Sequence, residues 1–472
     1  MSDLAGRSLH FIAIGGAGMS GLALACQAQG ARVSGSDRAA SAAIERLRAA
    51  GLEPTIGHDP EQVPADADVV VSTAIGADNV ELVRARERGQ RVIHRGALLA
   101  ELCGAKRLIA VAGAHGKTTT SGMLAHAMAA AGADPSFLLG GDLPGAGTAG
   151  EAANARWSSG EWVIAEADES DGSFLELRPE VAVVTNVELD HHSHWGGERE
   201  LREAFARFAA PAAALVRPAG PALAALDGAG SILSFALAEP GLAGPPAALL
   251  AAEIEPVSGG SRFTAVSEGV GELRVRLSVP GRHNVANALA ALGALIRARE
   301  LDPTLPPIED LAAGLESFPG MGRRLERKGS VGGALIYDDY AHHPTEVAAS
   351  LAALRGLPHR RLIAVFQPHL LSRTRALAPR FGRALAAADE IGVLEVYAAR
   401  EEPVGALAGV SGLSVAEAAA EAAPGRRVLW LGDQDRAFDA FAGELSEGDV
   451  LVTIGAGDVF KLAERLVGEG SD

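Results

Sequence analysis

The sequence LIAVAGAHGKTTTSGM, residues 108–123, predicts a strand, a tight loop and the start of a helix. Its apolar run breaks at Gly113, the chain turns through residues 114–116, and a helical pattern begins at Lys117. Backbone N–H groups of such a loop, together with the positive end of the helix, suit a phosphate group, and glycine lets the main chain come close. We therefore expect a phosphate-binding loop, with Lys117 on the outer phosphates and the Thr118 hydroxyl on Mg²⁺.

This loop departs from the general Walker A pattern, because Val111 stands where the first glycine belongs. The shorter GAHGKTTT remains, and the alternative is a Gly-Lys-Thr triplet that occurs by chance. Arginine carries most of the positive charge, and the only lysines are Lys106, Lys117, Lys328 and Lys461. A lysine at this place therefore argues against a chance match. The residues that we assign to ATP in this loop are Gly113, His115, Gly116, Lys117, Thr118 and Thr119.

Length and composition limit the class of protein. The chain has 472 residues, enough for roughly three domains of about 100–200 residues, and its composition is typical of α/β proteins. Two cysteines indicate a reducing compartment without a disulfide framework. A formal charge of −17 argues against nucleic-acid or anionic-membrane partners, which excess Lys and Arg would have to meet. With no signal-peptide pattern and no run of about 18 apolar residues, we expect a cytoplasmic protein.

A second glycine-rich turn stands near the start of the chain. The apolar run at residues 9–14 leads into GGAGMSG, residues 15–21, and a further strand at residues 31–35 ends in Ser36 and Asp37. The spacing G-x-G-x-x-G with a later acidic residue predicts a bound nucleotide diphosphate, and by itself it would suggest NAD. The alternative is a glycine turn without a ligand. Two more strand-like runs, at residues 68–72 and 91–94, and a helix at residues 97–102 complete a first domain near Gly104.

Acidic and histidine residues follow two later strands. The run at residues 162–165 leads into Glu166 and ADESD, and the run at residues 181–185 leads into NVELDHH, which contains His191. Ligands bind at the carboxyl edge of an open parallel sheet, so Glu166 and His191 are candidates to complete a Mg²⁺ site begun by Thr118. The alternative for Asp168 and its acidic neighbours is a solvated cap.

The carboxy-terminal part repeats the alternation of strands and helices. A hinge is expected at residues 317–322, and the strand-like runs that follow end in DDYAHHP, QPH and GAGD. Before the hinge, Asn284 opens a long apolar helix, where it either caps the helix or contacts a nucleotide. We predict three α/β domains, at residues 1–104, 105–319 and 320–472.

Eight motifs in this order resemble those of the Mur ligases, and the resemblance covers nearly the whole chain. The motifs are IGGAGMSG, GAHGKTTT, EADESD, NVELDHH, GRHNVANA, FPGMGRR, DDYAHHPTE and FQPHLLSRT. The resemblance implies an amino-terminal Rossmann-like domain for the UDP-sugar, a central P-loop ATPase domain, and a carboxy-terminal Rossmann-like domain that closes over ATP and presents the amino acid.

The resemblance also implies residue roles. The residues that it assigns to ATP, besides those of the phosphate loop, are Asn284, Asn287, Arg324 and Asp339. For the UDP-sugar, they are Gly16, Gly18, Met19, Ser20, Ser36, Asp37, Ser72 and Thr73. For magnesium, they are Thr118, Glu166 and His191. For catalysis and the amino-acid site, they are Lys117, His342, His369 and Arg373. Similar ligases often carry other residues where Ala114, Ser193 and Leu370 stand, so the resemblance implies no role for those three side chains.

One observation bears on the branch of the family. Mur ligases that add later residues use a carbamylated lysine for the second magnesium, and this chain has no lysine between Lys117 and Lys328. The resemblance then implies ATP-dependent joining of L-alanine to the lactyl carboxylate of UDP-N-acetylmuramate, through an acyl phosphate, in peptidoglycan precursor synthesis. Either His342 or His369 is expected to help deprotonate the amine. Three alternatives remain: a ligase that recycles a whole tripeptide onto the same UDP-sugar, a nicotinamide-dependent dehydrogenase, and a nucleotide-binding protein without catalysis.

Overall fold

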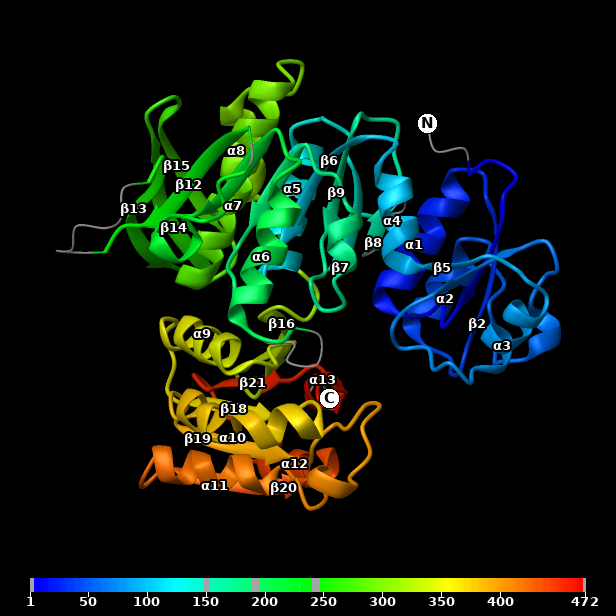
Figure 1. The fold of residues 1–472 in the computed structure, drawn as a ribbon. Coiled ribbons are helices and arrows are strands. Elements are labelled where there is room, and N and C mark those ends of the chain that lie inside the picture. Colours follow the sequence, from blue (N-terminus) through cyan, green and yellow to red (C-terminus); the bar gives the residue numbers. More distant parts are fainter. Residues whose placement is uncertain (1–3, 148–152, 189–194, 229, 240–246, 470–472) are drawn as a thin grey trace. The chain divides into compact units, whose positions relative to one another are not determined.

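The structure is a computed structural model that describes the chain except residues 1–3, 148–152, 189–194, 229, 240–246 and 470–472 (Figure 1). It divides into two compact units. The first comprises Met1–Glu253, Phe263–Val275 and Ala286–Pro319, and the second comprises Ile254–Arg262, Arg276–Val285 and Gly320–Asp472. The described residues form three separate sheets with helices between their strands, so the predicted α/β class is confirmed. The predicted domain boundaries stay a prediction.

The first sheet is parallel throughout and has the strand order β3-β2-β1-β4-β5. Its strands are β1 (Ser8–Ile12), β2 (Arg32–Asp37), β3 (Thr55–Ile56), β4 (Asp68–Val71) and β5 (Val92–His94). Its helices are α1 (Ala17–Ala28), α2 (Ala42–Ala49), α3 (Val80–Glu87) and α4 (Arg95–Cys103). The strand order reverses at β1, and nucleotides bind at such a switch point in doubly wound sheets. The glycine turn after β1 therefore lies where a Rossmann-like sheet places its ligand.

The second sheet has the order β15-β14-β13-β12-β11-β10-β6-β9-β7-β8. Its strands are β6 (Arg107–Ala112), β7 (Ser136–Leu143), β8 (Ala153–Arg156), β9 (Trp162–Glu166), β10 (Val181–Val184), β11 (Ala214–Pro218), β12 (Ser231–Leu237), β13 (Leu249–Val257), β14 (Gly260–Ser267) and β15 (Gly271–Leu277). Its helices are α5 (Lys117–Ala130), α6 (Glu198–Ala209), α7 (Arg282–Leu301) and α8 (Ile308–Glu316). Parallel neighbours β9 and β10 flank β6, so three strand ends meet around the phosphate loop.

An aromatic core supports this edge of the second sheet. Phe174 packs against Phe205 and Phe208 with ring centroids 5.3 Å apart in each case, and all three side chains are buried. Trp195 joins this group edge-on and donates its indole N–H to the backbone oxygen of Glu169 at 3.0 Å. The buried apolar area stabilises the fold, and the indole hydrogen bond fixes the acidic segment after β9.

The third sheet lies in the second unit and has the order β16-β17-β21-β18-β19-β20. Its strands are β16 (Glu326–Val331), β17 (Ala334–Asp339), β18 (Leu362–Phe366), β19 (Glu390–Leu394), β20 (Arg427–Gly432) and β21 (Val450–Ile454). Its helices are α9 (Pro344–Arg355), α10 (Leu371–Leu385), α11 (Leu413–Ala422), α12 (Gln434–Phe441) and α13 (Phe460–Glu469). Strands β17, β21 and β18 are parallel neighbours, so their polar carboxyl ends meet at one edge. No helix among the described residues is long and apolar enough to cross a membrane.

Candidate active site

The phosphate loop joins β6 to α5, as expected, and its geometry depends on two glycines. Gly113 and Gly116 have φ angles of 140° and 81°, which favour glycine. A Cβ atom on Gly116 would lie 2.3 Å from Asn287 Oδ1, and one on Gly113 would lie 2.1 Å from Thr185 Oγ1. Neither position can carry a side chain without displacing a neighbour. Asn287, on α7, is thereby placed beside the phosphate loop.

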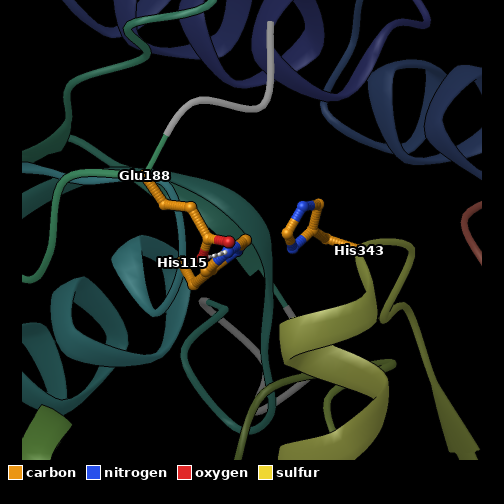
Figure 2. Close-up of side chains that lie close together, drawn as sticks. All are labelled: His115, Glu188 and His343. Carbon is orange, nitrogen blue, oxygen red and sulfur yellow. Dashed lines mark hydrogen bonds and ion pairs between the residues drawn. The ribbon is translucent and has the colours of Figure 1, made fainter. Parts of the chain in front are cut away.

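Residues at the end of β10 hold the loop in shape. Asn186 accepts a hydrogen bond from the His115 backbone N–H at 3.0 Å and donates one to the His115 carbonyl at 2.8 Å. The Thr185 hydroxyl donates to the same carbonyl at 2.6 Å. Figure 2 shows the His115 ring turned toward the Glu188 carboxylate, with Nε2 and Oε2 3.1 Å apart. The loop is therefore held by side-chain contacts of its own unit.

Lys117 is the first residue of α5, and its ammonium is nearly buried. Nζ donates to the Gly113 carbonyl at 2.7 Å and to both carboxylate oxygens of Glu169, at 2.8 and 3.1 Å. Burial disfavours the charged ammonium, but Glu169, Asp168 and Glu166 outweigh this effect and raise the pKa of Lys117. The side chain is therefore charged at working pH and held over the loop.

The predicted magnesium ligands Thr118 and Glu166 are close together. The Thr118 hydroxyl donates to Glu166 Oε2 at 2.9 Å, and the Gly140 backbone N–H donates to the same oxygen at 2.8 Å. Hydroxyl and carboxylate oxygens are the ligand types that Mg²⁺ prefers, so this pair fits the ion. His191, the third predicted ligand, and Ser193 lie outside the described residues.

The acidic segment after β9 is paired with cations. Arg95, the first residue of α4, has Nη2 at 2.8 Å from Asp168 and 3.4 Å from Asp171. Burial would raise the pKa of Asp168, but Lys117 and Arg95 hold it well below its usual range. The three carboxylates are therefore paired with cations, while Asp168 and Asp171 also cap the local turn through the backbone N–H groups of Ser170 and Ser173.

The amino-terminal turn brings the end of β2 to the start of α1. Asp37 Oδ2 accepts a hydrogen bond from the Gly15 backbone N–H at 2.9 Å, and Gly16 is the N-cap of α1. Met19 and Ser20 lie in α1 with buried side chains. The positions expected to contact the UDP-sugar that lie along this edge are Gly16, Gly18, Asp37 and, directly after β4, Ser72 and Thr73.

Ser36, another expected contact, faces a buried polar cluster. Its hydroxyl donates to Glu81 Oε2 at 2.6 Å, and both side chains are fully buried. His10 and His58 approach the same carboxylate oxygen at 3.6 and 3.5 Å. The side chain of Ser36 thus contributes to the interior of the first sheet.

Two of the expected nucleotide residues, Asp339 and Arg324, lie near the end of β17 in the second unit. Asp339 accepts hydrogen bonds from the Ser350 hydroxyl and from the Ala341 backbone N–H, and burial raises its pKa to about 6. Arg324 lies over the Tyr340 ring at 5.0 Å. Asn284 lies in the first turn of α7, where its amide donates to the Pro280 carbonyl at 2.7 Å.

The three residues expected to serve the amino acid are brought together in the second unit. The rings of His342 and His369 meet edge-on with centroids 6.3 Å apart, and Arg373 Nη1 lies 3.4 Å from His369 Nδ1. Tyr397 stacks on His369 with centroids 5.8 Å apart and an interplanar angle of 11°. Burial, followed by His342 and Arg373, lowers the pKa of His369 to about 4. The cluster thus combines a neutral imidazole with a permanent cation.

The chain matches three family descriptions that together span most of its length. These are the Mur ligase family catalytic domain over residues 8–107, the Mur ligase middle domain over residues 111–295, and the Mur ligase glutamate ligase domain over residues 323–457. The chain belongs to the Mur ligase family. Members of this family are ATP-dependent ligases.

Relatives of this Mur ligase cover almost the whole chain. A UDP-N-acetylmuramate–L-alanine ligase of Mycolicibacterium vanbaalenii is 46% identical, covering 98% of this chain and 96% of the relative. One of Kineococcus radiotolerans is 45% identical, covering 97% and 95%. The crystal structure of UDP-N-acetylmuramate-alanine ligase from Thermotoga maritima matches with a TM-score of 0.81 at 26% identity, covering 98% of each chain. A murein peptide ligase from Psychrobacter arcticus matches with a TM-score of 0.70 at 25% identity, covering 99% of each.

Sequence patterns missed several residues of this Mur ligase site. Asn186 and Thr185 hold the phosphate loop, and Arg95 pairs with the acidic segment, although it lies more than 70 residues earlier. The signal for Arg95 was a cation directly after a strand, at a helix start. Tyr397 follows β19 and had no signal, because a lone tyrosine after a strand is as common in cores as in sites.

Proposed function

We propose that this Mur ligase joins L-alanine to the lactyl carboxylate of UDP-N-acetylmuramate at the expense of ATP, and that it does so in the cytoplasm. Relatives that carry the name UDP-N-acetylmuramate–L-alanine ligase are 42–46% identical over nearly the whole chain and support this substrate pair. The structural observation that carries the proposal is the phosphate loop with Lys117 charged and held above it.

The reaction needs an activated carboxylate. An amine does not displace oxide from a carboxylate, so the carboxylate first attacks the γ-phosphorus of ATP and ADP leaves. The resulting acyl phosphate is then attacked by the amine of L-alanine, the amide bond forms and inorganic phosphate departs. Carboxylate and triphosphate repel one another strongly in a water-poor site. The Lys117 ammonium and the backbone N–H groups of the loop offset this charge as it moves.

Magnesium is part of the proposal, and Thr118 with Glu166 would hold it. When bound, the ion would neutralise phosphate charge during transfer. The support is the placement of the Thr118 hydroxyl 2.9 Å from Glu166 at the start of α5. The Gly140 N–H orients the same carboxylate.

The two remaining substrates are assigned to the amino-terminal glycine turn and to the histidine cluster of the second unit. The UDP-sugar is assigned to the turn at Gly16 and Gly18, which lies at the switch point of a Rossmann-like sheet. L-alanine is assigned to the cluster of His342, His369 and Arg373. Either His342 or His369 would accept a proton from the amine, because both imidazoles lie in this cluster.

A second candidate function is the addition of a whole tripeptide to the same UDP-sugar. It is supported by the TM-score of 0.70 to the Psychrobacter arcticus murein peptide ligase. Purified protein with UDP-N-acetylmuramate, ATP and Mg²⁺ should release ADP when L-alanine is added. Release only with the peptide L-alanyl-γ-D-glutamyl-meso-diaminopimelate would select the second function, and release with neither would overturn both.

A further inference from the structure

Arg95 lies between the amino-terminal glycine turn and the acidic segment beside the phosphate loop. It is the first residue of α4, directly after β5, and its side chain is 22% exposed. Its Nη1 atom lies 3.0 Å from the point where a Cβ atom on Gly18 would stand. Its Nη2 atom lies 2.8 Å from Asp168, which follows β9 of the second sheet. One guanidinium therefore contacts the amino-terminal glycine turn and the acidic segment beside the phosphate loop.

The guanidinium has hydrogen-bond donors to spare. Among the described residues, its hydrogen bonds to Asp168 and Asp171 both use Nη2. Nη1 and Nε have no hydrogen-bond partner there, and Nη1 faces the turn. Nη1 carries two N–H groups of its own, so it can donate to phosphate oxygens while Nη2 stays on the carboxylates.

The negative charge around Arg95 favours a cation at this position. Glu166, Asp168, Glu169 and Asp171 stand in one segment, and the chain as a whole carries a formal charge of −17. A diphosphate at the Gly18 turn would add further negative charge beside this segment. Backbone N–H groups and the dipole of α1 supply only partial positive charge, so a full charge nearby decides whether a diphosphate is held.

We propose that Arg95 is a substrate-positioning residue that binds the diphosphate of the UDP-sugar through Nη1, while Nη2 stays on Asp168. This inference rests on the proposed function, because it takes the sugar nucleotide to lie on the Gly18 turn. Asp168 is within electrostatic reach of Lys117. Arg95 therefore fixes the sugar nucleotide relative to the acidic segment that also faces the phosphate loop.

The test compares variants by direct calorimetric titration with UDP-N-acetylmuramate. Removing a charge-assisted bond to phosphate by Arg95→Ala should raise the Kd roughly 10- to 100-fold. Arg95→Lys keeps the charge without the planar fork and should fall between wild type and Arg95→Ala. The Km for ATP should change less than about threefold in either variant, since the contact is to the other substrate.

Two further variants separate ligand binding from a purely structural role. If Arg95 were only a latch between segments, Asp168→Asn would weaken UDP-N-acetylmuramate binding as much as Arg95→Ala does. We expect less than about a threefold change for Asp168→Asn, because the free donors of Arg95 remain and Asp171 still orients it. Arg32→Ala is the matched control, because Arg32 begins β2, at the edge of the sheet opposite the glycine turn, pairs with Asp66 at 2.5 Å and should leave binding unchanged.

Three outcomes have distinct meanings. Wild-type protein that fails to bind UDP-N-acetylmuramate overturns the proposed function itself. Wild-type binding with Arg95→Ala within threefold of it overturns this inference alone. Equal weakening by Arg95→Ala and Asp168→Asn, without partial rescue by Arg95→Lys, also overturns it in favour of the latch.

Discussion

The ammonium of Lys117 lies 2.8 Å from Glu169 Oε2, and both side chains are almost completely buried. The charge of Lys117 is therefore present before any nucleotide binds. Lys117→Ala should lower the rate of ADP release by at least about 10²- to 10³-fold, the usual effect of losing one group that stabilises transition-state charge. A rate assay at saturating substrates measures this. Activity above roughly a tenth of wild type would contradict the role assigned to Lys117.

Variants of Lys117 and Glu169 should affect the stability and the activity of the protein differently. Truncating Lys117 leaves a buried carboxylate without its partner, which should cost about 2–4 kcal/mol in the free energy of unfolding while the fold survives. Adding Glu169→Gln to Lys117→Met removes the unpaired charge and should recover much of that free energy. Urea unfolding of the single and double variants measures the recovery. The double variant should stay inactive, since it still lacks the cation.

The phosphate loop is the reason why we expect no dinucleotide at the first glycine turn. ATP has a site of its own at Gly113–Thr118, and the turn after β1 offers the N-terminus of α1 to a diphosphate sugar. Titration with NADH, followed by fluorescence, should therefore show no saturable binding. Micromolar binding that UDP-N-acetylmuramate does not displace would restore the dehydrogenase hypothesis.

Strands buried on both faces were the part of the fold that sequence predicts best. The runs that the sequence analysis placed before QPH and GAGD are strands β18 (Leu362–Phe366) and β21 (Val450–Ile454), because parallel strands between helices read as continuous apolar runs. The segment at residues 211–252 carries no clear sequence pattern, yet it holds β11, β12 and the start of β13. Alanine, glycine and proline suppress the usual periodicity there, and sheet pairing overrides local preference.

The candidate site also divides into residues that the sequence predicts and residues that it does not. Residues that share one strand-loop-helix unit, such as Lys117 and Thr118, were predicted together because their spacing is local. Contacts such as Arg95 with Asp168 depend on which strand ends become neighbours in space, and no periodic pattern encodes that. Backbone conformation is a third feature that the sequence did not predict. Leu370, beside the histidine cluster, has a left-handed φ of 68°, which is an outlier for a residue with a side chain.

His369 should make the stability of the second unit decrease at acidic pH. Burial and the neighbouring His342 and Arg373 lower its pKa from 6.5 to about 4. Between those two pH values the unfolded chain binds the proton and the folded chain does not, so the free energy of unfolding falls as pH falls from 6.5 toward 4. NMR titration of the imidazole should place its midpoint well below 6.5. His369→Gln should flatten the pH dependence of urea unfolding over this range, and an ordinary titration near 6.5 would contradict the prediction.

Discrimination against glycine should be modest. If His342, His369 and Arg373 hold the carboxylate and amine that all α-amino acids share, only a small side-chain pocket distinguishes substrates. One missing methyl group in an apolar pocket is worth about 1–3 kcal/mol, or roughly 10–200-fold in kcat/KM. Glycine and L-serine should thus be slow but measurable substrates, while L-glutamate and D-glutamate should be inert for steric reasons. Turnover of either glutamate would show that the pocket is not small.

Arg373→Ala tests which part of the amino acid this cluster holds. Arg373 lies on α10 with Nη1 3.4 Å from His369 Nδ1, so it presents a permanent cation beside a neutral imidazole. A cation on the shared carboxylate should support every accepted amino acid equally, and its loss should lower kcat/KM for L-alanine, glycine and L-serine by a similar factor. The measurement is kcat/KM for the three amino acids in wild type and variant, with Arg375→Ala on the same helix as control, because Arg375 donates to the Ala406 carbonyl instead. If Arg373→Ala changed the alanine-to-glycine ratio more than it changed either rate, Arg373 would contact the side-chain pocket and not the carboxylate.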